Sequence, residues 1–417
     1  MDMESQGSRL APTASAALSE EPVTQYGWKA LAGSVIGFSM DGFDMLILGF
    51  MLPAISAGLA LTGAQAGSLV TWTLLGAVTG GIIFGTMSDH FGRIKVLTWT
   101  IVIFAVFTGL CGLAQGYWDL VAYRTFAGVG LGGEFGIGMA LAAESWPDSK
   151  RARASSYVGL GWQAGVLLAA FVTPVLLPLI GWRGMFLVGL APALVAFVVR
   201  RTLHEPEIFV RRHASRSENS FRSLVKDTKT FKITLAIAIL CAIQNFGYYG
   251  IMIWMPTYLS KILGFNLMKS GVWTAVTVLG MACGVFVCGQ LADRIGRKPV
   301  FILFQAGALI MVLFYSRITE PNTLLLVGGV MGMFVNGAFG CIGALMSEAY
   351  PTRARATAQN VLFNIGRGIG SLGPLTVGVL AARYSFQAAI ALLASIYLVD
   401  IIVTLFLVPE LVGKPLE

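Results

Sequence analysis

The sequence predicts an all-α membrane protein made of two similar halves. Of its 417 residues, 56% are hydrophobic and only 12% are charged, which leaves too little polar surface to cover a water-soluble protein. Apolar stretches of about 20 residues, the length of a helix that crosses a bilayer, recur along most of the chain. A polar motif around Asp89 returns around Asp293, and each copy lies between two apolar stretches. These observations predict a duplicated bundle of transmembrane helices.

We expect twelve transmembrane helices, arranged as two pseudo-symmetric six-helix bundles. The first bundle covers 28–203 and the second covers 231–408, with tight turns at 115–118 and 180–183. A polar cytoplasmic linker at 204–230 separates them, and 1–27 and 409–417 form cytoplasmic tails. The spans expected from the apolar stretches are 28–58, 67–88, 96–115, 118–144, 154–180, 183–203, 231–262, 270–291, 299–317, 322–348, 356–382 and 386–408.

Basic residues indicate the orientation in the membrane. If both tails lie in the cytoplasm, 22 of the 29 Lys and Arg residues fall on the cytoplasmic side, as the positive-inside rule requires. We therefore expect a protein of the cytoplasmic (inner) membrane whose basic linker contacts anionic lipid headgroups. The net charge of +8 then reflects topology, and no nucleic-acid partner is expected. Residues 1–27 lack the pattern of a cleaved signal peptide and are expected to be disordered.

Cysteine and histidine usage argues against a metal site and against an enzyme. All five cysteines lie in apolar stretches, where thiols act as small hydrophobic side chains. The three histidines lie in expected loops, apart from the Cys and Asp clusters that a metal would need. The sequence has no Gly-x-x-x-x-Gly-Lys-Ser/Thr phosphate-binding loop, which disfavours ATP-driven transport. We expect no cofactor, only protons as the coupling ion.

Several motifs resemble those of known transport families. The repeated Gly-x-x-x-Asp-x-x-Gly-Arg of Gly85–Arg93 and Gly289–Arg297 resembles the signature of the major facilitator superfamily. The segment Asp41–Asp44 is similar to the Asp-Gly-x-Asp of aromatic acid:proton symporters. The glycine-rich run Arg124–Glu134 and the segment Glu144–Pro147 look like those of sialate:proton symporters and their monocarboxylate relatives. The resemblance implies the fold of that superfamily and the transport of organic anions with protons.

Asp41 and Asp44 are the main candidates for proton coupling. They lie near the middle of the first expected helix, and their i, i+3 spacing places them on one face. Two carboxylates this close in a low dielectric do not both stay ionised easily, so at least one is expected to take up a proton near neutral pH. The alternative is a structural role as a cap or in a salt bridge. The duplicated position of Asp41 is Asn245, which places the coupling in the first half.

Arg124 and Glu134 lie in the fourth expected helix. A charge in the membrane costs about 3 kcal/mol on insertion scales, so Arg124 needs a carboxylate, and Asp44 matches its depth. Either this pair opens when Asp44 takes up a proton, or it is a permanent structural contact. Arg124 is also a candidate for substrate binding. Glu134 is either a further protonation site or a structural contact in a glycine-rich run that allows close helix packing.

Arg367 is the leading candidate for substrate binding. It lies near the middle of the eleventh expected helix, which carries no acidic residue. An unpaired guanidinium there would hold a carboxylate through two hydrogen bonds, which favours an organic acid as the substrate. The alternative is a pair with Asp400 in the twelfth expected helix.

Further residues are expected to line the cavity or to act as gates. Gln244, Asn245, Tyr248 and Tyr249 place polar edges on one face of the seventh expected helix. The other candidates for substrate binding at mid-membrane depth are Gln163, Asn336 and Asn364, with Trp72, Phe135 and Trp162 as aromatic neighbours. Charged residues at cytoplasmic helix ends are expected to form gate contacts between helices: Asp89, Arg93, Asp293, Arg297, Glu144 and Glu348.

The sequence therefore predicts a proton-coupled secondary transporter and not an enzyme. We expect a monomer that imports a small organic anion, such as an aromatic acid, a sialate or another monocarboxylate, by alternating access. Proton uptake on Asp41 or Asp44 and carboxylate binding at Arg367 would together permit the inward movement. A proton-driven exporter of drugs or metabolites is the alternative, and a membrane sensor with the same fold is a third hypothesis.

Overall fold

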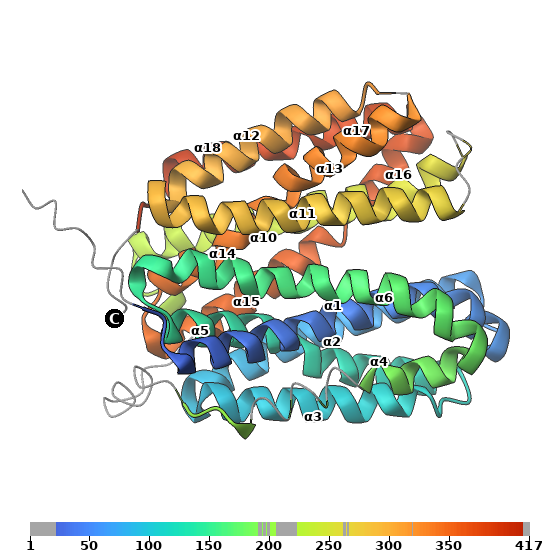
Figure 1. Ribbon diagram of the computed structural model, residues 1–417, viewed down its shortest axis with the longest axis horizontal. Coiled ribbons are helices and arrows are strands. Elements are labelled where there is room, and N and C mark those ends of the chain that lie inside the picture. The colour runs from blue at the N-terminus through green and yellow to red at the C-terminus, as the bar shows by residue number, and fades with distance from the viewer. Residues whose placement is uncertain are drawn as a thin grey trace, which may run out of the picture.

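Long, roughly parallel helices form two stacked groups in the computed structural model (Figure 1). The structure describes residues 22–190, 194, 197, 201–205, 223–261, 264, 267–318 and 320–411. Helices of the first half, coloured blue to green, make up the N-terminal bundle. Helices of the second half, coloured yellow to red, make up the C-terminal bundle, with α14 and α15 reaching across to the first.

The N-terminal bundle begins with α1 (Gln25–Leu59), α2 (Gly63–Phe91) and α3 (Arg93–Cys111). The short connection 112–116 follows α3, where the sequence predicts a turn at 115–118. The remaining elements are α4 (Tyr117–Gly132), α5 (Glu134–Ser145), the 3-10 helix η1 (Asp148–Lys150) and α6 (Arg151–Val188). Gly181 interrupts α6 with a φ of 66°, a value that favours glycine, and this confirms the turn predicted at 180–183.

The C-terminal bundle begins with α10 (Thr228–Lys261), α11 (Leu267–Ile295) and α12 (Arg297–Tyr315). It continues with α13 (Pro321–Gly337), α14 (Phe339–Ala349), the 3-10 helix η2 (Thr352–Ala354) and α15 (Arg355–Gly370). It ends with α16 (Gly373–Arg383), α17 (Phe386–Leu393) and α18 (Ser395–Leu407).

Four spans that the sequence predicts as single helices are each divided in two. They are 118–144 (α4 and α5), 322–348 (α13 and α14), 356–382 (α15 and α16) and 386–408 (α17 and α18). The first break falls at Gly133, and the second falls at Ala338, directly after Gly337, the duplicated position of Gly133. Glycine weakens a helix because its backbone has more freedom to lose. Hydrophobic periodicity does not detect such one-residue breaks.

Ten helical segments of the described chain are long and apolar enough to cross a membrane. Two of the twelve predicted spans are not among them. The span 183–203 lies partly outside the described residues. The span 356–382 is unusually polar, because α15 buries Gln359, Asn360, Asn364 and Arg367.

The two described ends of the chain lie at the same end of the bundles as the two repeated motifs, which we call the motif end. Near the start of α1, the Tyr26 hydroxyl donates a hydrogen bond to the carbonyl oxygen of His204. Beyond α18, Glu410 accepts a hydrogen bond of 3.0 Å from the backbone N–H of Arg297. This placement requires an even number of membrane crossings between the two ends.

Cysteine placement differs in part from the prediction of five buried thiols. A disulfide joins Cys288 of α11 to Cys341 of α14, two residues 53 positions apart in the sequence. Cys111 and Cys241 are buried thiols as predicted, whereas Cys283 is exposed. Only the packing of α11 on α14 brings the bonded pair together, so the sequence pattern could not reveal it.

Glycines bring α2 and α4 into backbone contact. A Cβ at Gly80 would lie 1.9 Å from the carbonyl oxygen of Val129. The duplicated contact between α11 and α13 has the same geometry, with a Cβ at Gly284 lying 2.0 Å from the carbonyl oxygen of Met333. Helices approach this closely only where small residues meet, so the repeat preserves the packing as well as the polar motifs.

Replacing Gly80 by valine should push α2 away from α4 and destabilise the protein by about 1–3 kcal/mol, the usual effect of overpacking. Thermal unfolding of the detergent-solubilised protein measures this. Gly49→Ala is the matched control, because a Cβ at Gly49 meets no atom within 4 Å. Alanine there should leave the unfolding midpoint unchanged or raise it. Equal midpoints for the two variants would contradict the packing role of Gly80.

Candidate functional site

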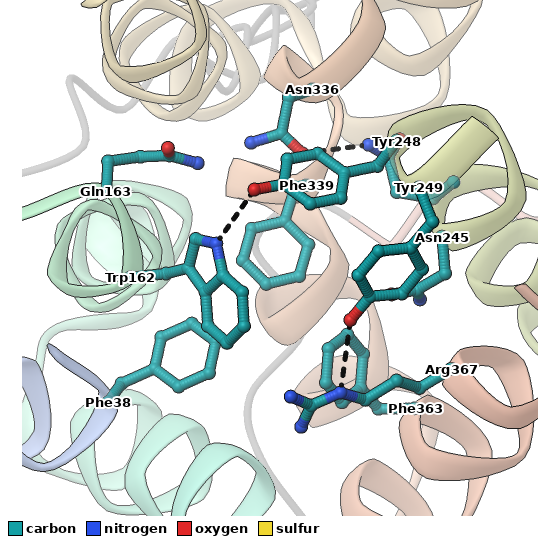
Figure 2. Close-up of a pocket in the computed structure, with 11 residues that line it drawn as sticks. Phe38, Trp162, Gln163, Asn245, Tyr248, Tyr249, Asn336, Phe339, Phe363 and Arg367 are labelled. Atoms are coloured by element: carbon teal, nitrogen blue, oxygen red, sulfur yellow. Dashed lines mark hydrogen bonds between the residues drawn. The ribbon is translucent and has the colours of Figure 1, made fainter. Parts of the chain in front are cut away.

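A cavity lies between the two bundles, near the middle of α1, α6 and α10 (Figure 2). Its volume is about 30 Å³, enough for about two water molecules, so an organic ligand has to displace side chains to enter. The N-terminal bundle contributes Phe38, Trp162 and Gln163. The C-terminal bundle contributes Gln244, Asn245, Tyr248, Tyr249, Asn336, Phe339, Phe363 and Arg367.

Arg367 is the only charged residue among the described residues that line the cavity. Its Nη1 and Nη2 atoms donate to the two carboxylate oxygens of Asp41 at 3.0 and 3.1 Å. Its Nε atom donates to the Tyr249 hydroxyl at 3.2 Å, and the guanidinium lies 5.4 Å from the centre of the Trp162 ring. This bidentate ion pair joins α15 of the C-terminal bundle to α1 of the N-terminal bundle.

The structure corrects both sequence-based alternatives for Arg367, which is neither unpaired nor bound to Asp400. Asp400 lies within the C-terminal bundle, beside the Gln305 side chain of α12 and near Tyr397. The true partner, Asp41, precedes Arg367 by 326 residues. The sequence could not identify it, because the contact exists only when the two bundles meet.

Arg124 and Asp44 form a second buried pair, inside the N-terminal bundle. Nη1 and Nη2 of Arg124 donate to the Asp44 carboxylate at 2.9 and 2.6 Å, and Nε donates to the Thr73 hydroxyl at 3.1 Å. The pairing predicted from depth is therefore confirmed, but neither residue lines the cavity. Asp41 and Asp44 therefore each face a guanidinium, in two separate ion pairs.

The polar side chains predicted at the cavity are mostly there. Gln163, Asn245, Tyr248, Tyr249 and Asn336 all line it. Asn364 does not, because its Nδ2 atom donates to the carbonyl oxygen of Gly132, at the break between α4 and α5, over 3.2 Å. Glu134 follows this break and accepts a hydrogen bond of 2.6 Å from Thr100, away from the cavity.

The three aromatic candidates have three different positions. Trp162 lines the cavity, and its indole N–H donates to the Tyr248 hydroxyl at 3.3 Å. Phe135 packs directly behind the lining residue Phe363, with ring centres 3.7 Å apart. Trp72 is exposed on the outside of the N-terminal bundle, so it is not a cavity residue.

At the motif end, the first repeated motif caps a helix of the opposite bundle. Asp89 on α2 accepts hydrogen bonds from the backbone N–H groups of Ala356 (3.2 Å) and Thr357 (2.8 Å), in the first turn of α15. Negative charge is stabilised there by the unpaired N–H groups and the dipole of the helix. Arg93 holds Asp89 in place with a contact of 2.5 Å and also donates to Glu144 at 3.0 Å.

The second motif repeats the arrangement with the bundles exchanged. Asp293 on α11 accepts hydrogen bonds from the N–H groups of Ala152 and Arg153 in the first turn of α6, both at 3.1 Å. Arg297 contacts Asp293 at 2.8 Å and Glu348 at 2.7 Å. The six predicted gate residues therefore all form contacts between helices at this end.

The two halves of this network differ at one duplicated arginine. Arg355 of the C-terminal bundle reaches Glu144 of the N-terminal bundle at 2.7 Å. Its counterpart, Arg151, instead pairs with Asp148 in its own bundle. The second motif has a different charged contact between the bundles, in which Arg153 of α6 contacts Asp293 at 3.4 Å.

Some residues of the site are missing from the sequence-based prediction. Phe38, Phe339 and Phe363 line the cavity. Helical spacing carries a signal for two of them, since Phe38 precedes Asp41 by three positions and Phe363 precedes Arg367 by four. Glu205 caps the start of α3 by accepting from the N–H of Arg93 at 2.7 Å, and Glu410 does the same for α12.

Duplicated bundles with buried ion pairs around a central cavity define the architecture of a secondary transporter. The family model of the Major Facilitator Superfamily matches residues 34–294 and 270–416, so the chain belongs to this superfamily. The fold and family predicted from the repeated motifs are confirmed. A solved structure of the proton:xylose symporter XylE aligns with a TM-score of 0.81 at 18% identity, covering 95% of this chain and 98% of its own.

Three relatives indicate the range of substrates in this part of the superfamily. A putative metabolite transport protein of Haemophilus influenzae is 65% identical over 95% of this chain and 99% of its own. A probable 4-methylmuconolactone transporter of Cupriavidus pinatubonensis is 31% identical over 91% and 90%. A sialic acid transporter of Escherichia coli is 27% identical over 87% and 89%. The protein is thus a multi-pass membrane transporter of small organic metabolites and not an enzyme.

Asp89→Ala should favour the state that is open at the motif end, because it removes the cap of α15 and one partner of Arg93. A loss of about 1–3 kcal/mol would shift the two populations by roughly 5- to 150-fold. The labelling rate of a single cysteine placed in the vestibule at the motif end, with Cys283 replaced, measures this shift. Substrate affinity should stay within a few-fold, since the motif lies about half a bilayer, roughly 15 Å, from the cavity.

Asp293→Ala is the matched variant for the second motif and should shift the labelling in the same direction. The two shifts should be similar in size, because each substitution removes one helix cap and both variants keep the contact between Arg355 and Glu144. Unchanged labelling in Asp89→Ala would contradict a gating role for the motif.

Proposed function

We propose that this protein imports a small organic monocarboxylate together with one proton across the cytoplasmic membrane. The observation that carries the proposal is the pair between Arg367 and Asp41, in which the cation of the cavity is bound to a carboxylate of the opposite bundle. The relatives named for a muconolactone and for sialic acid support an organic acid as the substrate class.

The pair offers a direct way to couple a proton to a substrate. While Asp41 is ionised, it occupies the two guanidinium nitrogens that a substrate carboxylate would use. A proton on Asp41 removes its charge and leaves Arg367 as a buried cation that lacks an anion, which is strongly unfavourable. A substrate carboxylate then takes the place of Asp41 through the same two hydrogen bonds. Proton and substrate therefore bind together, and each alone binds weakly.

The exchange keeps the charge of the cavity constant. In the empty carrier, ionised Asp41 balances Arg367, and in the loaded carrier the substrate carboxylate balances it while Asp41 is neutral. Both forms can thus change conformation without moving net charge through the membrane field. One proton accompanies each anion, and a pH difference of one unit, worth about 1.4 kcal/mol, supports about tenfold accumulation.

The distribution of basic residues supports an orientation with the motif end in the cytoplasm. The contacts of Asp89 and Asp293 then close the cytoplasmic side of the cavity. Substrate would enter from the outside and leave after these contacts open. We propose that a single chain suffices, because both ends of the cavity are built from one chain.

Asp41→Asn should abolish uphill transport and retain exchange. In vesicles with an alkaline interior, the unmodified protein should accumulate a substrate acid about tenfold per pH unit, and uptake should acidify the interior. With asparagine at position 41, Arg367 is available to the substrate at every pH, so binding should lose its pH dependence while counterflow persists. An exporter would instead expel substrate against a gradient when protons flow inward, and a sensor would bind without counterflow.

Asp44→Asn is the matched control for this prediction. It removes the same charge from the same helix, but from the pair with Arg124 outside the cavity. Its substrate binding should keep its pH dependence. If Asp44→Asn abolishes that dependence and Asp41→Asn preserves it, the coupling belongs to the Arg124 pair and the proposed exchange is wrong.

Arg367→Lys should keep the positive charge but lose the paired geometry of the guanidinium. Carboxylate binding should weaken by about 1–3 kcal/mol, and Arg367→Ala should weaken it further. Calorimetric titration of the purified protein with an organic acid measures the change. Unchanged affinity in Arg367→Ala would show that Arg367 serves only as the structural partner of Asp41.

A further inference from the structure

The cavity has a second polar end, opposite Arg367. Figure 2 shows Gln163 and Asn336 along the upper edge of the cavity and Arg367 along the lower edge, with the rings of Trp162 and Phe339 between them. Arg367 supplies a positive charge, whereas the upper edge presents only carboxamides. A ligand that spans the cavity therefore meets two chemically different ends.

Gln163 on α6 is poised to bind a ligand. Its side chain is only 1% exposed, and neither its amide nitrogen nor its amide oxygen has a hydrogen-bond partner within the described structure. Proteins leave few buried polar atoms unpaired, because desolvation without a new hydrogen bond is costly. A buried carboxamide with both atoms unpaired, at the wall of a cavity, marks a position where a polar group of the ligand completes the bonding.

Asn336 is held so that it supplies a further donor at the same edge. Its Oδ1 atom accepts a hydrogen bond of 3.1 Å from Nε2 of Gln244, which also donates to the carbonyl oxygen of Val335 at 2.8 Å. This engages the amide oxygen and leaves the amide nitrogen of Asn336 to face the cavity (Figure 2). The edge thus offers amide N–H donors and one amide acceptor.

Flat aromatic surfaces fill the space between the two ends. The Trp162 ring is fixed by its hydrogen bond to Tyr248, and it packs on Phe38 with ring centres 5.6 Å apart. The Phe38 ring is in turn stacked on Phe339 at 6.1 Å. Rings in this arrangement favour a planar, unsaturated body that can stack between them.

We infer that Gln163 and Asn336 bind an uncharged polar group, such as a hydroxyl, a carbonyl or a ring nitrogen, at the end of a planar monocarboxylate opposite its carboxylate. A second carboxylate does not suit this end, because none of the described lining residues there is cationic and a desolvated anion without a cation is strongly unfavourable. The inference rests on the proposed function for the carboxylate at Arg367 and narrows its substrate class.

The arrangement also links recognition to movement. The carboxylate is bound by the C-terminal bundle through Arg367, and the uncharged group is bound by Gln163 of the N-terminal bundle. A ligand with both groups bridges the two bundles, whereas a ligand without the second group contacts the polar residues of only one. The second group should therefore contribute to transport as well as to affinity.

The test is calorimetric binding to the purified full-length protein at one fixed pH, with three acids of the same ring. The probes are benzoate, 4-hydroxybenzoate and terephthalate, which carry hydrogen, hydroxyl and a second carboxylate opposite the first. The hydroxyl should improve affinity by up to about tenfold over hydrogen, the scale of a neutral hydrogen bond. Terephthalate should bind at least about a hundredfold more weakly than 4-hydroxybenzoate.

Gln163→Ala should abolish the preference for the hydroxyl while leaving benzoate affinity within a few-fold. Gln163→Met, which keeps the length of the side chain, is the second variant if the alanine variant does not fold. Gln305→Ala removes a buried carboxamide outside the cavity and should leave the ratio between the probes unchanged. Gln163→Arg should admit terephthalate, because it supplies the missing cation.

Two results would overturn the inference. One is a hydroxyl preference that survives in both Gln163→Ala and Gln163→Met, and the other is terephthalate binding as tight as that of 4-hydroxybenzoate. Failure of the proposed function is a separate result, because Arg367→Ala would then leave the affinity of all three acids unchanged. Loss of the hydroxyl preference in the Gln163 variants would still support the second polar end in that case.

Discussion

The ion pair between Arg367 and Asp41 is the interaction on which the rest of the site depends. It is buried, it joins the two bundles, and it contributes the only charge among the described lining residues of the cavity. A guanidinium in such a place needs an anion at all times. In the proposed function, two anions bind it in turn, the Asp41 carboxylate and a substrate carboxylate. In the proposed function, this constraint links proton uptake to substrate binding without any contact between proton and substrate.

The contacts at the motif end have a different role in the proposed transport cycle, in which they hold the two bundles together and later release them. Asp89 and Asp293 do so by capping helices of the opposite bundle, contacts worth about 1 kcal/mol each. Such contacts bias a conformational equilibrium without fixing it. Each motif also has a charged contact between the bundles, Arg355 with Glu144 at the first motif and Arg153 with Asp293 at the second.

The ends of the cavity divide recognition between charge and hydrogen bonding. In the proposed function, Arg367 binds the carboxylate that all organic acids share and therefore selects weakly among them. Gln163 and Asn336 present neutral groups, which distinguish acids by what they carry at the far end. Specificity of this kind arises from the unpaired Gln163 amide as much as from the charge. A ligand that leaves this amide unpaired binds more weakly, because the amide then makes no hydrogen bonds.

The sequence by itself determined the properties that depend on local pattern and on the internal repeat. Hydropathy predicts the spans, the offset between Asp89 and Asp293 predicts the duplicated motif contacts, and matching depth within one bundle predicts the pair of Asp44 with Arg124. Only the tertiary structure decided that Arg367 binds Asp41, that Asn364 turns away from the cavity, and that Gln163 is left unpaired within it. These facts depend on how one bundle faces the other, and neither hydrophobic periodicity nor residue spacing encodes the relative position of helices so far apart in the chain.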